Sequence, residues 1–280
     1  MATIEAVDIH FHYGHGADVL RGISLKIGPG ERVAIMGENG AGKTTLIKHF
    51  NGLLKPTSGE ILVDGVRTRD VSVARLSRKI GIVFQKPENQ FFAETAEEEI
   101  AFGLKNFRFD EGEVAKRVEE ALRFASLVKY KGRSPFLLSG GEKKRLAIAS
   151  VIAWDPEVLM IDEPTIGQDM SQKIRLSSFL REVSAKGKTV VLVTHDVDFA
   201  ADICQRVILL SSGVVIGDGR VEEIFSDAEL MRRASLLPPR LAEVLRRLGL
   251  SDFPAGAFRI DEVEKLIEEA VTDDDGARRV

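Results

Sequence analysis

The chain has 280 residues, of which 44% are hydrophobic and 29% charged, so it can form one large domain or two modest ones with a sizeable core. Basic and acidic side chains nearly balance at a net charge of −4, which argues against a general attraction to nucleic acid. The longest apolar stretches, residues 146–154 and 207–217, reach only about half of the ~20 residues that a membrane-spanning helix needs, so we expect no span.

Short apolar runs bounded by glycine and proline predict early strands over residues 4–10, 25–27, 32–36, 60–63 and 80–84. Between residues 110 and 131, apolar residues recur at steps of three and four, which predicts an amphipathic helix. Later runs rich in Val, Ile and Leu are typical of buried parallel strands, and they cover residues 158–161, 189–194 and 207–210. We therefore expect an α/β fold with a helical insert.

The last part of the chain has a different character. After about residue 219 it becomes helical and charged, with apolar stripes that begin at Leu241 and Ile260. We predict a first domain over residues 1–219, which holds a helical subdomain at about 86–152. A small α-helical extension then covers residues 220–280 and ends in a frayed, charged tail.

Residues 37–45 read GENGAGKTT and match the phosphate-loop pattern G-x-x-x-x-G-K-[ST] between an expected strand and an expected helix. Glycines let backbone N–H groups approach phosphates, and the helix N-terminus adds its positive dipole end. Lys43 is expected to reach the terminal phosphates and Thr44 to bind Mg²⁺. The predicted nucleotide-binding residues are Gly37, Glu38, Asn39, Gly40, Ala41, Gly42, Lys43, Thr44 and Thr45.

Two further strand ends carry polar residues. Asp162 and Glu163 close the apolar run 158–161, and His195 follows the run 189–194. Since the carboxyl ends of parallel strands line the ligand crevice, Asp162 is expected to orient Mg²⁺, Glu163 to activate a water and His195 to contact the γ-phosphate. The alternatives are that one carboxylate merely caps the next helix and that His195 is a core residue.

LSGGE at residues 138–142, upstream of the acidic strand, and Gln85 after the strand 80–84 occur in a specific order with the phosphate loop. With these motifs the chain resembles the ATP-binding-cassette (ABC) ATPases over about residues 3–225. The resemblance implies the P-loop NTPase fold with a mixed sheet core, an antiparallel β-subdomain and a helical subdomain. It also implies that ATP lies between one subunit's phosphate loop and the other's signature segment, residues 138–142, in a homodimer or in a heterodimer with a second ABC ATPase.

The resemblance assigns further roles. Tyr13 resembles the aromatic residue that stacks on adenine, although it is also compatible with an ordinary strand aromatic. Gln85 resembles the glutamine that touches Mg²⁺ and the attacking water, and Asp169 resembles the aspartate that joins the two sites. Ser139, Gly140 and Gly141 look like the groups that approach the γ-phosphate across the dimer. With ATP and Mg²⁺, the catalytic set is then Glu163, His195, Gln85 and Lys43, and the metal set is Thr44, Gln85 and Asp162.

After Gln85, the segments KPENQFF and AEEEIAFG look like those of the ATPase components of energy-coupling-factor importers. These take up vitamins or transition-metal ions such as cobalt and nickel through a membrane scaffold (T) protein and a substrate-binding membrane (S) protein. The resemblance places the chain peripherally on the cytoplasmic face of the membrane, consistent with a start that lacks a signal-peptide pattern and with the single Cys204. Phe91 and Phe92 are candidates for contact with the scaffold, or are core residues.

Some features depart from the family or compete with this interpretation. The signature continues as Glu142, Lys143, Lys144 and Arg145 where many relatives carry glutamines, and Gln168 stands where a leucine usually precedes the aspartate. The competing function is a non-transport ABC ATPase that acts on DNA or the ribosome. Because the chain shows no long coiled-coil insertion, zinc module or basic run, we expect no nucleic-acid partner. Histidines at 10, 12 and 15 invite a metal site, but no cysteine or carboxylate completes a convincing set.

Overall fold

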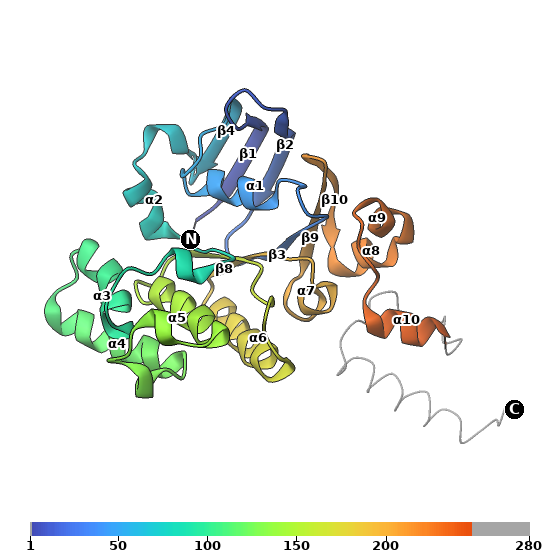
Figure 1. Cartoon of the computed structure of the whole chain (residues 1–280). Coiled ribbons are helices and arrows are strands. Elements are labelled where there is room, and N and C mark those ends of the chain that lie inside the picture. Colours follow the sequence, from blue (N-terminus) through green and yellow to red (C-terminus); the bar gives the residue numbers. More distant parts are fainter. Residues whose placement is uncertain (1, 248–280) are drawn as a thin grey trace, which may run out of the picture.

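The computed structural model describes residues 2–247, and they form the α/β fold with a mixed sheet that the sequence predicts (Figure 1). In Figure 1 the antiparallel sheet and α1 lie at the top, α3, α4 and α5 gather at the lower left, and α8, α9 and α10 lie at the right. No helix within residues 2–247 is long and apolar enough to cross a membrane.

A four-stranded antiparallel sheet has the order β2 (Asp18–Ile27), β1 (Ile4–His12), β4 (Ser58–Val63) and β5 (Val66–Arg67). Burial alternates along β1 and β2, as expected for a sheet with one face on the core. β1 bulges at Asp8, whose φ is +48°, and a Cβ on Gly59 would meet the Asp8 carbonyl oxygen at 2.1 Å. Glycine at position 59 therefore permits the close pairing of β1 and β4.

The central sheet has the order β10 (Val214–Arg220), β9 (Arg206–Ser211), β3 (Arg32–Met36), β8 (Thr189–Val193), β7 (Val158–Asp162) and β6 (Ile80–Val83). Only the β10 and β9 pair in this sheet is antiparallel. Ile35 lies opposite Val193, and Asp162 lies opposite Val193 from the other side. The carboxyl ends of β3, β8 and β7 therefore meet at one edge of the sheet.

Helices cover the sheets and extend beyond them. In chain order they are α1 (Lys43–Phe50), α2 (Val73–Lys79), α3 (Ala96–Asn106), α4 (Glu111–Phe124), α5 (Gly140–Ile152), α6 (Met170–Ala185), α7 (Val197–Ile203), α8 (Val221–Ser226), α9 (Ala228–Arg233) and α10 (Arg240–Arg247). Short 3₁₀ turns lie at Thr68–Asp70, Pro87–Asn89, Val128–Tyr130 and Pro135–Leu137.

Two hydrophobic cores share the central sheet. Along β3, Val33 and Ile35 face the core beneath the antiparallel sheet and α1, whereas Ala34 and Met36 face the core formed with the larger helices. A strand buried on both faces must be apolar at every position, which explains why the central strands appear in the sequence as continuous runs. The phosphate loop lies where both cores meet the edge of the sheet, since it directly follows β3.

The predicted elements match the structure with different precision. The strand expected at 32–36 has those bounds, whereas the strand expected at 25–27 begins earlier, at Asp18. The helix expected between 110 and 131 is α4, capped by Asp110 and ended before Ser126, whose φ is +56°. The stripe beginning at Leu241 lies on α10. The stripe beginning at Ile260 and the tail fall outside the described residues, and the division at residue 219 stays a prediction.

Candidate functional site

The phosphate loop joins β3 to α1 and depends on glycines in left-handed backbone conformations. Gly37 has φ +141°, and a Cβ there would meet the Leu210 carbonyl oxygen at 1.9 Å. Gly42, the N-cap of α1, has φ +100° and supplies no side-chain cap. The first N–H groups of α1 therefore have no hydroxyl or carboxylate cap from the N-cap residue, which is the arrangement that binds an anion at a helix N-terminus.

Lys43 begins α1, and its side chain bends back over the loop. Its Nζ donates to the carbonyl oxygens of Gly37 and Glu38, both at 2.8 Å. Burial lowers the pKa of Lys43, while the nearby charges of Glu163 and Asp162 oppose that shift. The ammonium therefore lies in the loop beside two carboxylates, and its contacts with neutral carbonyls can be exchanged for contacts with phosphate oxygens.

Asp162 ends β7 next to the phosphate loop and is almost fully buried. Its Oδ2 accepts a hydrogen bond of 2.7 Å from the hydroxyl of Thr44. Its Oδ1 is buried and has no hydrogen-bond partner among the described residues. Burial raises the pKa of Asp162, and the Thr44 bond counteracts this. A hydroxyl and a buried carboxylate with an unsatisfied oxygen are oxygen ligands of the kind that Mg²⁺ accepts.

Glu163 follows β7 in a left-handed conformation, with φ +49°. Its N–H donates to the Val193 carbonyl at 2.7 Å, which ties it to the end of β8. Its carboxylate lies 2.9 Å from Nδ1 of His195 through Oε1, and it accepts a bond of 3.4 Å from the Thr194 hydroxyl through Oε2. The structure thus brings the two predicted strand-end residues, Glu163 and His195, into direct contact.

Gln85 and Tyr13 each follow a strand, β6 and β1 respectively. Gln85 follows β6 by two positions and is exposed, and its carbonyl oxygen is 3.5 Å from Nζ of Lys144. Tyr13 follows β1, is 49% exposed, and its hydroxyl lies 3.2 Å from the hydroxyl of Thr45 in α1. An edge-to-face contact with Phe11, at 4.8 Å between ring centroids, holds the Tyr13 ring at the entrance to the loop.

The signature segment lies at the N-terminus of α5. Ser139 is the N-cap, and it forms a capping box with Glu142: the Ser139 N–H donates to Glu142 Oε2 at 2.8 Å, and the Glu142 N–H donates to Ser139 Oγ at 3.4 Å. The Ser139 N–H and the Tyr130 hydroxyl lower the pKa of Glu142 to about 2. Among residues 2–247 no hydrogen bond joins this segment to the phosphate loop.

Asp169 is the N-cap of the next helix, α6. Its Oδ1 accepts from the Gln172 N–H at 2.8 Å at the start of α6, and Gln172 packs against Gly141 of the signature segment. One turn further, Lys173 bonds to Asp196 at 2.6 Å, directly after His195. Burial would raise the pKa of Asp196, but the Lys173 bond contributes to holding it below its usual range.

Sequence reasoning missed the role of Lys144 in this arrangement. The sequence marks it only as a departure from a glutamine, yet its side chain is buried and its Nζ donates to the carbonyl oxygen of Glu163. Lysine patterns give no sign of burial, because lysines are almost always solvent-exposed. The one available signal was a basic residue at an α5 position where the helical period calls for a side chain facing the core.

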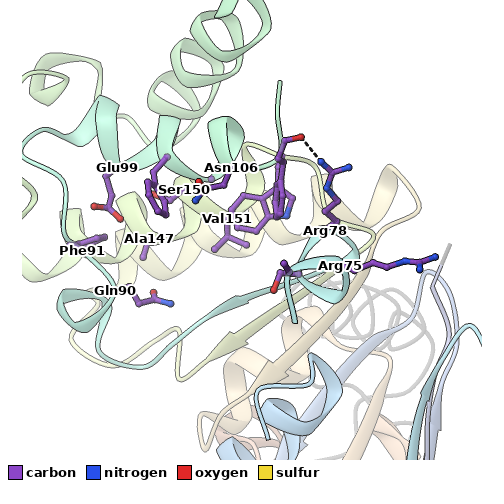
Figure 2. Close-up of a pocket in the computed structure, with 15 residues that line it drawn as sticks. Arg75, Arg78, Gln90, Phe91, Glu99, Asn106, Ala147, Ser150 and Val151 are labelled. Atoms are coloured by element: carbon purple, nitrogen blue, oxygen red, sulfur yellow. Dashed lines mark hydrogen bonds between the residues drawn. The ribbon is translucent and has the colours of Figure 1, made fainter. Parts of the chain in front are cut away.

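A groove separates α2 from α3 and α5 (Figure 2). Its volume is about 710 Å³, and apolar side chains dominate its walls. Phe91 lines it but is buried in the core, whereas Phe92 is 57% exposed and stacks edge-to-face on Phe102, which also lines the groove. Of the two alternatives given for this pair, Phe91 is therefore a core residue, and Phe92 is accessible for contact. Arg78, at the opposite wall, donates to the Phe107 carbonyl (Figure 2).

Comparisons with known proteins identify a family whose members bind ATP, which agrees with a phosphate-loop site. A family model described as ABC transporter matches residues 20–166. The energy-coupling factor transporter ATP-binding protein EcfA of Methanothermobacter thermautotrophicus is 46% identical over 253 residues, which cover 89% of this chain and 81% of that protein. Its namesake in Methanocaldococcus jannaschii is 40% identical over 271 residues, covering 95% and 97%.

Solved structures give the same result for the fold. The structure of cbiO1 from Clostridium perfringens, described as part of the ABC transporter complex cbiONQ, matches with a TM-score of 0.72 and 36% identity over 87% of this chain and 98% of that one. An ATP-binding cassette solved as a dimer in a post-hydrolysis state with ADP and Pi matches with a TM-score of 0.71 and 32% identity, over 78% and 98%.

Proposed function

Because the chain belongs to the ABC transporter family, we propose that it is the ATP-binding and ATP-hydrolysing subunit of an energy-coupling-factor importer. The observation that carries the proposal is the meeting of Lys43, Thr44, Asp162, Glu163 and His195 at one edge of the central sheet. Two relatives that are 46% and 40% identical to this chain carry energy-coupling-factor names, which supports this branch of the family. The cargo, a vitamin or a transition-metal ion such as cobalt or nickel, stays a prediction.

ATP binds with its phosphates on the phosphate loop. The N–H groups at the start of α1 and the ammonium of Lys43 hold the β- and γ-phosphates, and the exposed ring face of Tyr13 stacks on adenine. Mg²⁺ fits the site because the Thr44 hydroxyl and the unsatisfied Oδ1 of Asp162 are both oxygen ligands, with Gln85 as the third residue of the set. When bound, the ion neutralises phosphate charge.

Glu163 acts as the general base of hydrolysis. Its carboxylate takes a proton from a water whose oxygen forms the new bond to the γ-phosphorus, and the bond between that phosphorus and ADP breaks with its electron pair on ADP. His195, in contact with Glu163 through Nδ1, holds the carboxylate in position, and its side chain is 55% exposed, so that it also reaches the γ-phosphate. Gln85 orients the water.

A second ABC ATPase chain, either a copy of this one or a related one, completes each site. Ser139, Gly140 and Gly141 approach the γ-phosphate bound on the partner's phosphate loop, and Asp169 links the two sites. Ser139 and Gly140 are exposed, whereas Gly141 is buried beside Gln172, so the first two are the accessible residues of the segment. The apolar side chains of Ile166, Met170 and Ile174 near Asp169 are exposed as well. Large exposed apolar side chains next to a polar site are typical of an interface.

The groove between α2, α3 and α5 receives the membrane scaffold (T) protein, and this scaffold carries a substrate-binding membrane (S) protein. Phe102 offers an apolar anchor in the groove, since it is 46% exposed and supported by Phe92. Glu99 at its wall is buried and accepts from the N–H groups of Phe92 and Ala93 at 3.0 Å, which holds the loop before α3 in place. The chain would thus lie peripherally on the cytoplasmic face of the membrane.

Co-purification tests this assignment. A tagged Glu163→Gln chain, expressed in the native host and extracted in mild detergent with ATP, is expected to bring down a scaffold protein and a small integral membrane protein. Adding Phe102→Glu, in the groove, should abolish the recovery, whereas Val66→Glu, at a position of similar exposure (50%) on β5, should not. Recovery of soluble or nucleic-acid partners alone would refute the importer function and leave the ATPase.

A further inference from the structure

Lys144 is a buried lysine whose ammonium bonds to backbone instead of to a carboxylate. Its side chain is 4% exposed, and Nζ donates to the carbonyl oxygen of Glu163 and, at 3.5 Å, to that of Gln85. Within residues 2–247 it forms no ion pair. Burial lowers the pKa of Lys144, and the charges of Asp162, Glu163 and Glu88 oppose the shift. A buried cation is costly, so its position calls for a functional reason.

Lys144 holds the carbonyl oxygen of Glu163, for which the described part of the chain shows no other hydrogen-bond donor. The N–H of Glu163 is bonded to Val193 and its carboxylate to His195, at 2.7 and 2.9 Å. Its left-handed φ of +49° is costly for a residue with a side chain and persists only where the surroundings impose it. By holding the carbonyl oxygen, Lys144 fixes the following peptide and, through it, the direction in which the glutamate side chain leaves the backbone.

The helix that carries Lys144 also forms a wall of the groove. Ala147 and Val151 follow Lys144 at steps of three and seven residues, so the three lie along one face of α5. Ala147 and Val151 line the groove together with Ser150 (Figure 2). Because these residues belong to one continuous helix, a displacement of the groove face of α5 would also displace Lys144 and the signature segment at its N-terminus.

We propose that Lys144 is a positioning residue for hydrolysis, which links the groove face of α5 to the backbone of Glu163 and Gln85. Occupation of the groove shifts α5, and the ammonium carries that shift to the general base of the same chain. This inference rests on the proposed ATPase function. It adds a path within one subunit from the membrane partner to the catalytic glutamate, alongside the path across the dimer through the signature segment.

The test compares three side chains at this position in the full complex with the membrane partner. Lys144→Met keeps length and volume without the ammonium, and Lys144→Gln retains one N–H donor. Lys116→Met, exposed on α4, is the matched control for loss of a lysine from the helical region. We expect kcat for ATP to fall about tenfold or more in Lys144→Met, to fall less in Lys144→Gln, and to stay at the wild-type value in Lys116→Met. KM for ATP should change less than twofold throughout.

Other outcomes overturn the inference in distinguishable ways. Wild-type kcat in both Lys144 variants, or a loss in which kcat and nucleotide affinity fall together with the melting temperature, would assign Lys144 a structural role only. If Lys144→Met does not fold, Lys144→Gln alone decides by the same criteria. Absence of ATP turnover by the wild-type complex would refute the proposed ATPase function itself, and the positioning role with it.

Discussion

The N-termini of α1 and α5 are both glycine-rich and both belong to the expected ATP site, but they differ in whether a side chain caps them. Gly42 leaves α1 without a side-chain cap, and Lys43, Asp162 and Glu163 of the same chain surround it. α5 instead begins with a complete capping box of Ser139 and Glu142. An open helix end attracts an anion, whereas a capped one is stable without it.

This difference indicates that the two helix N-termini have different roles, α1 in nucleotide binding and α5 in hydrolysis. The phosphate loop is assembled by its own chain and is ready to bind nucleotide in a monomer. In the signature segment the capping box satisfies the N–H groups of Ser139 and Glu142. Under the proposed function, this segment contributes only when a second chain presents ATP in the closed dimer. Changes at α5 should therefore affect turnover, and changes at α1 should affect binding.

Ser139→Arg should produce the largest effect of the α5 changes. The arginine replaces an exposed hydroxyl at the proposed dimer contact, and loss of one preorganised donor to a transferring group costs about 100-fold in rate. ATP binding by the monomer should change less than threefold, measured by fluorescent-nucleotide titration beside phosphate release. Asp110→Arg, at the exposed N-cap of α4, is the control for loss of a cap. Equal loss of binding and turnover in Ser139→Arg would contradict the assignment of binding to α1 and turnover to α5.

Lys43→Ala should affect binding first. Hydrogen bonds to charged groups contribute about 1.5–3 kcal/mol, so ATP affinity is expected to fall about 10- to 100-fold. The substitution removes the bonds from Nζ to the carbonyl oxygens of Gly37 and Glu38, but the glycine conformations of the phosphate loop remain, so we expect the loop to keep its shape. Isothermal titration with ATP and with adenosine checks this, since adenosine lacks the phosphates and should bind both proteins equally. A loss for adenosine as large as for ATP would point to a collapsed loop.

Tyr13→Ala should have a smaller effect on the same end of the site. Stacking of a base on an aromatic ring is worth about 1–3 kcal/mol, and because Tyr13 is half exposed we expect about tenfold weaker ATP binding. Tyr13→Phe keeps the ring and removes only the contact with Thr45, so its affinity should stay within about twofold. The same loss in both variants would assign the effect to the hydroxyl instead of the ring.

The pKa of Glu142 gives the smallest expected effect, and it tests whether the capping box of α5 forms. Its pKa of about 2 lies below the ordinary 4.5, so the bonds it accepts stabilise the fold above pH 4.5 and are lost as pH falls toward 2. A carboxyl titration by NMR should find Glu142 still ionised at pH 3. Tyr130→Phe removes one of the two main donors and should raise the pKa. Titration of Glu142 near 4.5 in the wild type would show that the capping box does not form in solution.

The sequence predicts the phosphate-loop side of the molecule better than the α5 side, for physical reasons. Positions 37, 40 and 42 adopt backbone conformations that favour glycine, and the strands that position Asp162 and His195 must be apolar, so both leave a pattern in the sequence. The contact between Glu163 and His195 depends on strand order, and the order of β3, β8 and β7 is set by packing of the whole sheet.

The α5 side depends on contacts between residues far apart in the chain. Lys144 reaches the carbonyl oxygens of Gln85 and Glu163, which follow β6 and β7. The helical period of α5 indicates a core-facing position, but a local window does not identify these distant partners. Phe91 and Phe92 are adjacent and chemically identical, yet one is in the core and the other is exposed. Which of the two phenylalanines is buried depends on the backbone conformation of the loop before α3.

The central claim is that the signature segment of a second chain completes the ATP-binding site. The mass of the Glu163→Gln chain in solution tests this claim directly. Analytical ultracentrifugation with Mg²⁺ and ATP should show twice the mass found with ADP, and adding Ser139→Arg should return the mass to the ADP value while ATP stays bound. A mass that is the same in ATP and ADP, with nucleotide bound in both, would contradict the account.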